Sequence, residues 1–458
     1  MKGLLFTYLL TYGGAFTALF RPYYGFLIYV CFSIIKPPAL WFWMVPPGNY
    51  SRIIGVALLI GWVFNGCGNW NFGRSRTTLL CLIGFLAWMI LSTALSPSPV
   101  MGWHEVLNYT KIVLPFLAGL TLINSREDIR KLVWVIIAST GYVAYEYNVH
   151  YFSGGDHDHF LKLDGNSLSI MMLSGCGVAF YYGLFLQHGW RRWLLFLISA
   201  LIAHIPMASM SRGGMVGVVA LGGVSFVLIP KTIRFLTFYG LACMAGLYLA
   251  GPSVVTEFIS TFTDKNEWEN DHYGRVFMWK ACFNEMTKHP LIGCGQDRWP
   301  LVAKSYGFGE GKEAHSLWAQ TAAELGVPGI GFLGGFYLYT IWSLWRLSRE
   351  QSDPELRALS KMVILGLTGF VVPASFVSVQ GFEIPYYVAL IGAAVLKLSD
   401  STVGVFPPYA VAEHAMRSQH HDGSRYRTTS APNAPVESFG FPWTVLNETR
   451  AYWGRQGP

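Results

Sequence analysis

Apolar runs separated by short polar stretches recur along the chain from its first residues to about residue 400. Runs of about 17–22 residues can cross the roughly 30 Å hydrocarbon core of a bilayer as α-helices, whereas a β-barrel would show alternating segments of about ten residues. The pattern therefore predicts an all-α polytopic membrane protein with about 12–13 transmembrane helices. The predicted spans are residues 4–20, 22–36, 51–67, 78–95, 108–123, 131–151, 166–187, 192–208, 213–229, 233–251, 327–345, 360–377 and 384–398.

Composition agrees with this class. Only 13% of the residues are charged, against about 25% in a soluble globular protein. The 49 glycines suit closely packed membrane helices. The net charge of +7 comes from basic residues scattered over short loops, without a dense lysine and arginine run that would bind a phosphate backbone. Membrane lipids are therefore expected partners and nucleic acid is not.

Charge also predicts the orientation of the chain. Alternate loops are rich in lysine and arginine, and the positive-inside rule places these loops in the cytoplasm. We expect a membrane bundle over residues 1–251, a periplasmic loop over 252–326, further membrane helices over 327–398 and a cytoplasmic tail over 399–458. The loop can be external despite its lysines and arginines, because long segments translocate largely regardless of charge. The tail is polar, lacks periodicity and reads as disordered.

The first candidate for chemistry is the stretch ASMSRGGMVG, residues 208–217. Arg212 lies between two apolar spans with no acidic residue nearby in sequence, and a charge at membrane depth is usually functional. Gly213 and Gly214 leave room beside the guanidinium for a bulky group. The alternative is an arginine whose head reaches the external headgroups.

The second candidate lies in the predicted periplasmic loop. The stretch DHYGRVFMWKACFNEMTKHPLIGCGQDRW, residues 271–299, contains an amphipathic helical pattern typical of a helix that lies on a membrane surface. Its apolar face is formed by Val276, Trp279, Phe283 and Met286, with Arg275 in the first turn and Pro290 just beyond the end. Helix N-termini attract anions, and an arginine there adds a bidentate fork for phosphate. A solvated surface arginine explains the same pattern equally well.

The third candidate is EAHSLWAQTAAELGVPG, residues 313–329. Its helical stripe, ended by Gly326 and Pro328, places His315 in the first turn. The positive end of a helix disfavours imidazolium, so a neutral ring would be available as a general base near neutral pH. A histidine that only packs or caps at an interface is the alternative.

A fourth stretch, GGDHDHFLKLDGN, contains Asp156, His157, Asp158 and His159. These residue types can ligate a metal, but adjacent residues alternate in direction and no second cluster completes a site. A solvated loop is the preferred interpretation, and no metal or other cofactor is expected.

Taken together, these motifs resemble the O-antigen ligase family, which includes O-antigen polymerases and O-linked oligosaccharyltransferases. The N-terminal stretch 20–42 and the stretch DGNSLSI, residues 164–170, resemble the branch described as exosortase-associated O-glycosylation ligases. The resemblance covers about residues 1–400. The residues that carry it are Ser211, Arg212, Gly213, Gly214, Gly274, Arg275, Trp279, His289, Pro290, Gly293, Gly295, Ala314, His315, Ser316, Glu324, Gly326 and Gly329.

The resemblance implies a GT-C-like membrane glycosyltransferase of the inner membrane. Such an enzyme takes a glycan from undecaprenyl pyrophosphate on the periplasmic face and joins it to a hydroxyl of lipid A–core, a protein or another glycan, without metal or nucleotide. Arg212 and Arg275 would stabilise the pyrophosphate and His315 would deprotonate the acceptor, with inversion at the anomeric carbon. Secondary substrate contacts would come from Lys280, His289, Arg298, Ser211 and Ser316. Asparagine is common in the family at the place of Ser316.

Two other functions are open. A repeat-unit polymerase of the same fold would carry the same motifs. A non-enzymatic lipid or polysaccharide transporter would show paired broken helices and ionisable residues at mid-membrane, and the predicted spans contain few of these.

Overall fold

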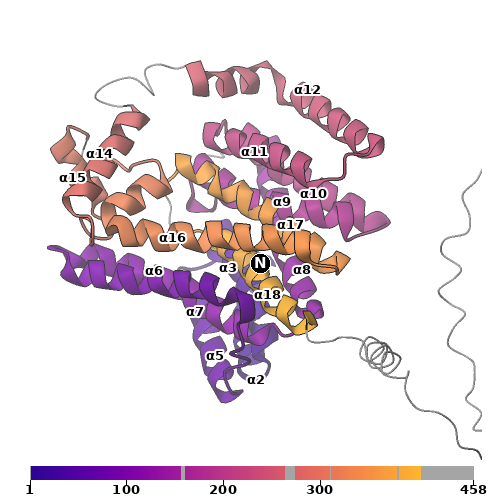
Figure 1. The fold of residues 1–458 in the computed structure, drawn as a ribbon, viewed down its shortest axis with the longest axis horizontal. Helices are drawn as coiled ribbons and strands as arrows, with labels where there is room; N and C mark the ends of the chain where they lie inside the picture. The colour runs from indigo at the N-terminus through magenta and orange to yellow at the C-terminus, as the bar shows by residue number, and fades with distance from the viewer. Residues whose placement is uncertain (1, 156–159, 264–273, 310, 379–380, 404–458) are drawn as a thin grey trace, which may run out of the picture. The chain divides into compact units, whose positions relative to one another are not determined.

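The computed structural model describes residues 2–155, 160–263, 274–309, 311–378 and 381–403. Within these ranges the chain is helical and contains no β-strand (Figure 1). All of the described residues fall in one compact unit, Met1–Gly404. Residues 404–458, most of the predicted tail, lie outside the described residues, as does the Asp156–His159 stretch.

The first half of the chain supplies mostly long apolar helices. They begin with a hairpin in which Arg21 separates two helical segments, and Pro22 opens the second at a position that proline tolerates well. The elements are α1 (Lys2–Tyr8), η1 (Leu9–Gly13), α2 (Gly14–Phe20), α3 (Pro22–Ile35), α4 (Pro37–Leu40), α5 (Tyr50–Phe64), η2 (Gly73–Ser75), α6 (Arg76–Leu95), α7 (Pro99–Leu122), α8 (Arg126–Phe152), η3 (Phe160–Lys162) and α9 (Gly165–Phe185).

The second half carries the motif-bearing segments between further apolar helices. The elements are α10 (Trp190–Ala208), α11 (Arg212–Leu228), α12 (Ile233–Thr263), α14 (Arg275–Lys288), α15 (Trp299–Val302), η4 (Ala303–Tyr306), α16 (Leu317–Glu350), α17 (Pro354–Val371), η5 (Pro373–Phe376) and α18 (Glu383–Val403). Most residues of α9, α17 and α18 are buried, so these three helices form much of the core.

The structure is that of an all-α polytopic membrane protein. Each of the thirteen predicted spans overlaps a helix. By length and composition, seven described helical stretches could cross a membrane, and the bent pair Ile233–Gly246 and Gly251–Ser260 would be an eighth. The other predicted spans lie on the shorter helices α5 and α11 or on α7, α8 and α18, which carry more polar and charged residues. The number of crossings, 12–13, therefore stays a prediction.

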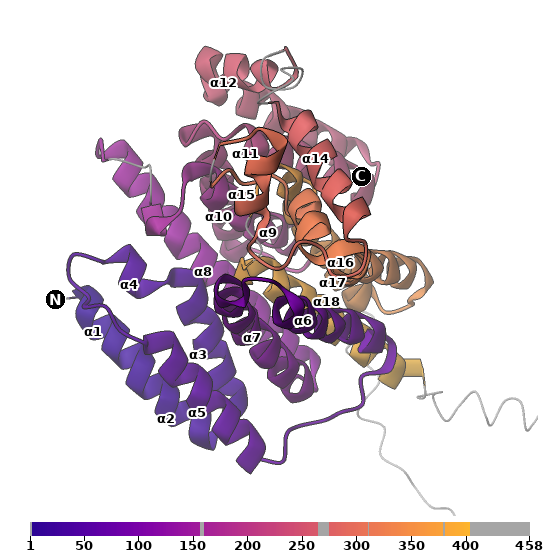
Figure 2. The ribbon, with the colours of Figure 1, turned by 90° about the vertical axis from the view of Figure 1, so that its left-hand side faces the viewer.

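Segments of the predicted periplasmic loop gather near one end of α16. Figures 1 and 2 both place α14 and α15 beside the N-terminal end of α16, with α6 running alongside the same helix. Two predicted breaks coincide with glycines in backbone conformations that other residues rarely adopt. The predicted span 233–251 ends where Gly251 interrupts α12 (φ 75°), and α16 is interrupted at Gly326 (φ 67°).

The face that α14 buries in the protein differs from its predicted apolar face. Arg275 stands in the first turn as predicted, but the buried face consists of Met278, Ala281, Cys282 and Glu285, and Phe283 of the predicted apolar face is 47% exposed. Small Ala281 and Cys282 let α14 approach its neighbours closely, and buried Glu285 accepts a hydrogen bond from the Tyr306 hydroxyl at 2.8 Å. Close packing and a paired carboxylate therefore determine the buried face, and hydrophobicity alone does not.

Candidate functional site

Ser211 fixes the start of α11 and ties it to two other elements. Its Oγ accepts a hydrogen bond from the backbone N of Gly214 at 3.0 Å, as an N-cap serine does, and donates to Oδ1 of Asn166 at 2.7 Å. The Asn166 amide in turn donates to the carbonyl oxygen of Phe376 at 3.1 Å. The Ser211 hydroxyl thus joins α11 to the start of α9 and the end of η5, a structural role that the sequence did not predict.

Arg212 is the first residue of α11, and its side chain is 20% exposed. Its Nε donates to Oε1 of Glu257 at 2.5 Å. Glu257 lies in the second half of α12, 45 residues away in sequence, so the lack of a nearby acidic residue in the sequence did not mean the lack of a partner in space. The carboxylate stabilises the guanidinium charge in a half-buried setting.

Arg275 is the first residue of α14 and follows the N-cap Gly274, which has no side chain to cap the helix. Its guanidinium carbon lies 5.9 Å from the centroid of the Phe376 ring, within the range of a cation–π contact. One turn later, the Trp279 ring lies 6.4 Å from the same phenylalanine ring. The Trp279 indole N–H donates to the carbonyl oxygen of Ala314 at 3.2 Å, so α14 also contacts the segment that carries His315.

Phe376 links the SRGG motif to α14, and Trp279 links α14 to the segment that carries His315. Phe376 contacts Arg275 and Trp279 of α14 through its ring and Asn166 of α9 through its backbone. A Cβ on Gly213 would come within 2.8 Å of the Phe376 Cβ, so glycine in SRGG allows α11 to approach. We call this set, with Ser211, Arg212 and the segment 314–316, the Phe376 cluster.

His315 precedes its helix and does not lie in its first turn, contrary to the sequence-based expectation. The helix begins at Leu317 because Ser316 is its N-cap, and the Ser316 Oγ accepts a hydrogen bond from the backbone N of Ala319 at 3.3 Å. His315 has φ 50°, a left-handed conformation that is uncommon for residues other than glycine and that clusters at functional sites. Its side chain is half-buried.

Ser316 is 4% exposed, and its hydroxyl oxygen serves as a helix cap. An asparagine at this position would cap the helix equally well. The difference from the residue common in the family therefore preserves the local structure.

The remaining motifs form a scaffold. One of these motifs is the segment from His289 to Gly295. The backbone N atoms of Cys294 and Gly295 in this segment donate to the carbonyls of Ala323 and Glu324 at 2.9 and 3.0 Å. A Cβ on Gly293 would come within 2.3 Å of the Glu324 carbonyl, so only glycine fits there. The fully buried Glu324 carboxylate accepts hydrogen bonds from the Trp299 backbone N at 3.3 Å and the Gln320 amide at 3.1 Å. These contacts hold the loop against α16.

Three predicted substrate-binding residues have other surroundings. Lys280 is exposed on α14, and His289 at the opposite end of that helix is roughly 20 Å along its axis from Arg275. The His289 ring lies 3.7 Å from Glu285 and is 56% exposed. Arg298 donates to the Cys294 carbonyl at 3.1 Å and contacts Ser96 at the end of α6. None of the three has a described contact with the Phe376 cluster.

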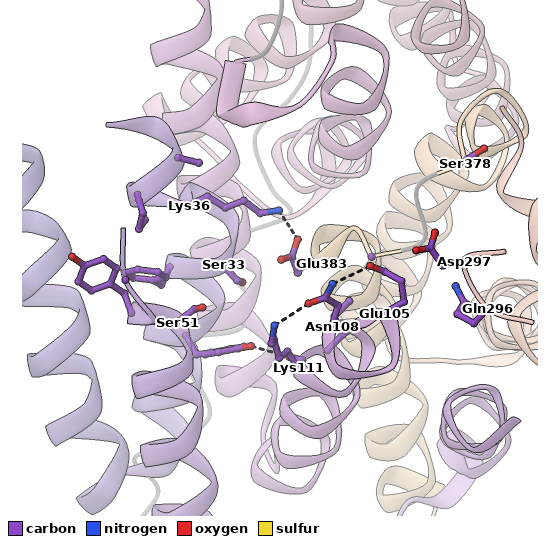
Figure 3. Close-up of a pocket in the computed structure, with 18 of the residues that line it drawn as sticks. Ser33, Lys36, Ser51, Glu105, Asn108, Lys111, Gln296, Asp297, Ser378 and Glu383 are labelled. Atoms are coloured by element: carbon purple, nitrogen blue, oxygen red, sulfur yellow. Dashed lines mark hydrogen bonds and ion pairs between the residues drawn. The ribbon is translucent and has the colours of Figure 1, made fainter. Parts of the chain in front are cut away.

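The sequence did not reveal a polar cavity of about 580 Å³ beside this cluster (Figure 3). Its wall combines residues of α3, α5 and α7 with Gln296, Asp297, Glu313, Gln320, Ser378, Gly381 and Glu383. Figure 3 shows Lys36 and Glu383 pointing toward each other, 3.1 Å apart, and a row of hydrogen bonds from Lys111 through Asn108 to Glu105. The residues that line the cavity come from distant parts of the sequence and form no motif.

Two family models match the chain. Residues 194–334 match the model of O-antigen ligase, and residues 1–170 match a family of unknown function, DUF5935. No curated protein matches the chain. The resemblance to the O-antigen ligase family is thereby confirmed, over the region that supplies Arg212, Arg275 and His315.

Proposed function

We propose that this protein transfers a glycan from undecaprenyl pyrophosphate to an acceptor hydroxyl at the periplasmic face of the bacterial inner membrane. One observation carries the proposal: SRGG and the α14 arginine both approach Phe376, and Trp279 of α14 contacts Ala314 beside His315, although these segments come from separate parts of the chain. The match to O-antigen ligase over residues 194–334 supports an O-antigen ligase or polymerase type of membrane enzyme.

In the proposed reaction, the acceptor oxygen attacks the anomeric carbon of the donor sugar. The bond between that carbon and the pyrophosphate oxygen breaks, and its electron pair leaves with the pyrophosphate. Arg212 and Arg275 stabilise the developing negative charge, which is most effective where fixed cations are shielded from water. His315 takes the proton of the acceptor hydroxyl. A single displacement of this kind inverts the anomeric configuration.

The surroundings of the two arginines suit these roles. Arg275 stands at a helix N-terminus, where unpaired backbone N–H groups and the helix dipole also favour an anion. Glu257 already holds Arg212 by its Nε, so the guanidinium is oriented before a donor arrives. Phe376 and Trp279 form apolar walls beside Arg275, which lower the local dielectric.

A reconstituted assay tests the proposal. The purified protein in liposomes is given an undecaprenyl-pyrophosphate-linked glycan with lipid A–core, with a serine- and threonine-rich protein, or with a second donor molecule as acceptor. Formation of a glycosidic product with loss of undecaprenyl pyrophosphate supports transfer, and the productive acceptor distinguishes ligase, protein glycosylation and polymerase. Movement of the lipid-linked glycan across the bilayer without covalent transfer would instead support a transporter.

A further inference from the structure

The polar cavity next to the Phe376 cluster has the wrong charge for the pyrophosphate. Carboxylates outnumber lysines on its wall: Glu105, Asp297, Glu313 and Glu383 against Lys36 and Lys111. Lys36 is already paired with Glu383, and Lys111 donates to the Asn108 amide oxygen. A pyrophosphate would meet net repulsion here, whereas a neutral or cationic ligand would not.

The polar groups of this cavity suit a ligand with many hydroxyl groups. Carboxylates and side-chain amides can each bind hydroxyls, and both kinds of group lie along the wall. The side chains of Gln296 and Gln320 line the cavity and are only 3% and 6% exposed. Buried Tyr29 and Tyr50 add aromatic surface.

Ser378 gives an independent indication of a ligand. It lines the cavity and is 5% exposed, and among the described residues its hydroxyl has no hydrogen-bond partner. A buried hydroxyl without a partner is costly, and a bound hydroxyl group would satisfy it. Ser378 follows Phe376 by two residues, so this group lies close to the Phe376 cluster in the chain.

The segment that carries His315 connects the cavity to the Phe376 cluster. Glu313 and Gln320 line the cavity on either side of this residue in sequence. The Gln320 amide oxygen accepts a hydrogen bond from the Ala314 N at 3.3 Å, and the Ala314 carbonyl accepts one from Trp279 of the cluster. A hydroxyl presented from the cavity would therefore reach the segment that bears His315.

We infer that this cavity binds the acceptor, as a neutral or cationic hydroxyl-rich glycan, while the anionic donor occupies the Phe376 cluster. This inference rests on the proposed glycan transfer. It also gives a role to the N-terminal region that matches a family of unknown function. That region supplies the α3, α5 and α7 side of the cavity. The O-antigen ligase region supplies Gln296, Asp297, Glu313 and Gln320, and Ser378, Gly381 and Glu383 follow it in the chain. The N-terminal region then selects the acceptor.

The test measures equilibrium binding without donor, using full-length protein in nanodiscs. The probe is the saccharide fraction released by mild acid hydrolysis from the envelope glycoconjugates of the source bacterium. We expect saturable binding to the wild-type protein, and Glu105→Ala combined with Asp297→Ala should weaken it by roughly tenfold or more. Ser51→Trp, which fills the cavity without removing a charge, should weaken binding as well. Glu350→Ala, an exposed carboxylate on α16, is the matched control and should not alter binding.

Three results would overturn the inference. They are unchanged saccharide binding in the cavity variants, displacement of the saccharide by inorganic pyrophosphate, and binding of a serine- and threonine-rich peptide pool in place of saccharide. His315→Ala should bind the saccharide normally while failing in a parallel transfer assay. Loss of cavity binding with intact transfer contradicts the acceptor site alone, whereas normal transfer by His315→Ala contradicts the proposed mechanism alone.

Discussion

The guanidinium carbon of Arg275 lies 5.9 Å from the centroid of the Phe376 ring, and the two residues are separated by 101 positions in sequence. The contact joins the first turn of α14 to the end of η5. Asn166 contacts the Phe376 backbone and Gly213 lies against its Cβ, so this one residue links the segments that carry Arg275 and Arg212. A hydrophobic residue without a motif thus organises the candidate catalytic site.

Phe376→Leu should slow glycan transfer while leaving the protein inserted and stable. Loss of a cation–π contact of about 0.5–2 kcal/mol corresponds to a rate loss of roughly two- to thirtyfold if the contact orients Arg275 for the transition state. Initial transfer rates with saturating acceptor measure this effect. Phe283→Leu on the exposed face of α14 is the control and should keep the wild-type rate. Equal rates for the wild type and Phe376→Leu would show that the ring does not position Arg275.

Arg212→Lys should impair transfer although it preserves the charge. A lysine lacks the planar fork that can bind Glu257 and a phosphate oxygen at the same time. Loss of a charge-assisted hydrogen bond predicts a reduction of roughly ten- to a hundredfold in the transfer rate. The same exchange at Arg346, an exposed residue paired with Glu350, should have no effect. Full activity of Arg212→Lys would mean that charge alone suffices.

The helices could be predicted from the sequence because apolar runs of membrane-spanning length leave few alternatives to a helix. The predicted helical stretch that follows His315 is interrupted at Gly326, where its end was expected, and Arg275 lies in the first turn of its helix as predicted. The buried face of α14 was not, because Ala281 and Cys282 pack by their small size and Glu285 by its partner Tyr306. The periodicity of hydrophobic residues indicates neither the packing of small side chains nor the presence of a hydrogen-bond partner.

Only part of the site could be predicted for a similar reason. Arg212, Arg275 and the segment of His315 stand in recognisable local patterns, whereas Glu257 and Phe376 become relevant only through contacts across long stretches of sequence. The cavity is the extreme case, because the residues that line it are spread over the sequence from Tyr29 to Glu383. The position of His315 was missed by two residues because a serine next to it is the better N-cap.

Gly326→Ala should destabilise the protein. Gly326 has φ 67° and ψ −165°, a region that only glycine adopts readily, and a Cβ there would come within 2.5 Å of the carbonyl oxygens of Pro290 and Leu291. We expect a loss of about 1–3 kcal/mol from the backbone conformation alone, with more from the clash. Thermal unfolding in detergent measures it. Gly331→Ala, further along α16 and with open space around the added Cβ, should be neutral, and equal loss in both variants would contradict this explanation.

Asp297→Asn should stabilise the protein at neutral pH. Burial raises the pKa of the Asp297 carboxyl, Glu105 raises it further and His104 acts in the opposite direction. The folded state therefore binds this proton more tightly than the unfolded state, and stability falls as the pH rises through the folded-state pKa. Asp297→Asn removes the titrating carboxyl and therefore removes this loss of stability at higher pH.

The difference in unfolding temperature between Asp297→Asn and the wild type should be largest at pH 7 and shrink toward about pH 4. Asparagine also suits the left-handed backbone of Asp297 (φ 59°), but that gain does not depend on pH. A difference that stays constant with pH would contradict the charge-based explanation.

The most direct test of the central claim is donor turnover by His315→Ala in reconstituted membranes that contain lipid-linked glycan and acceptor. We expect transfer to fall by roughly a hundredfold or more, as for loss of a general base, while donor binding persists and the lipid-linked glycan remains intact. Ser316→Ala, which removes the neighbouring helix cap but leaves the imidazole, should retain much of the activity. Transfer at the wild-type rate by His315→Ala would contradict the account.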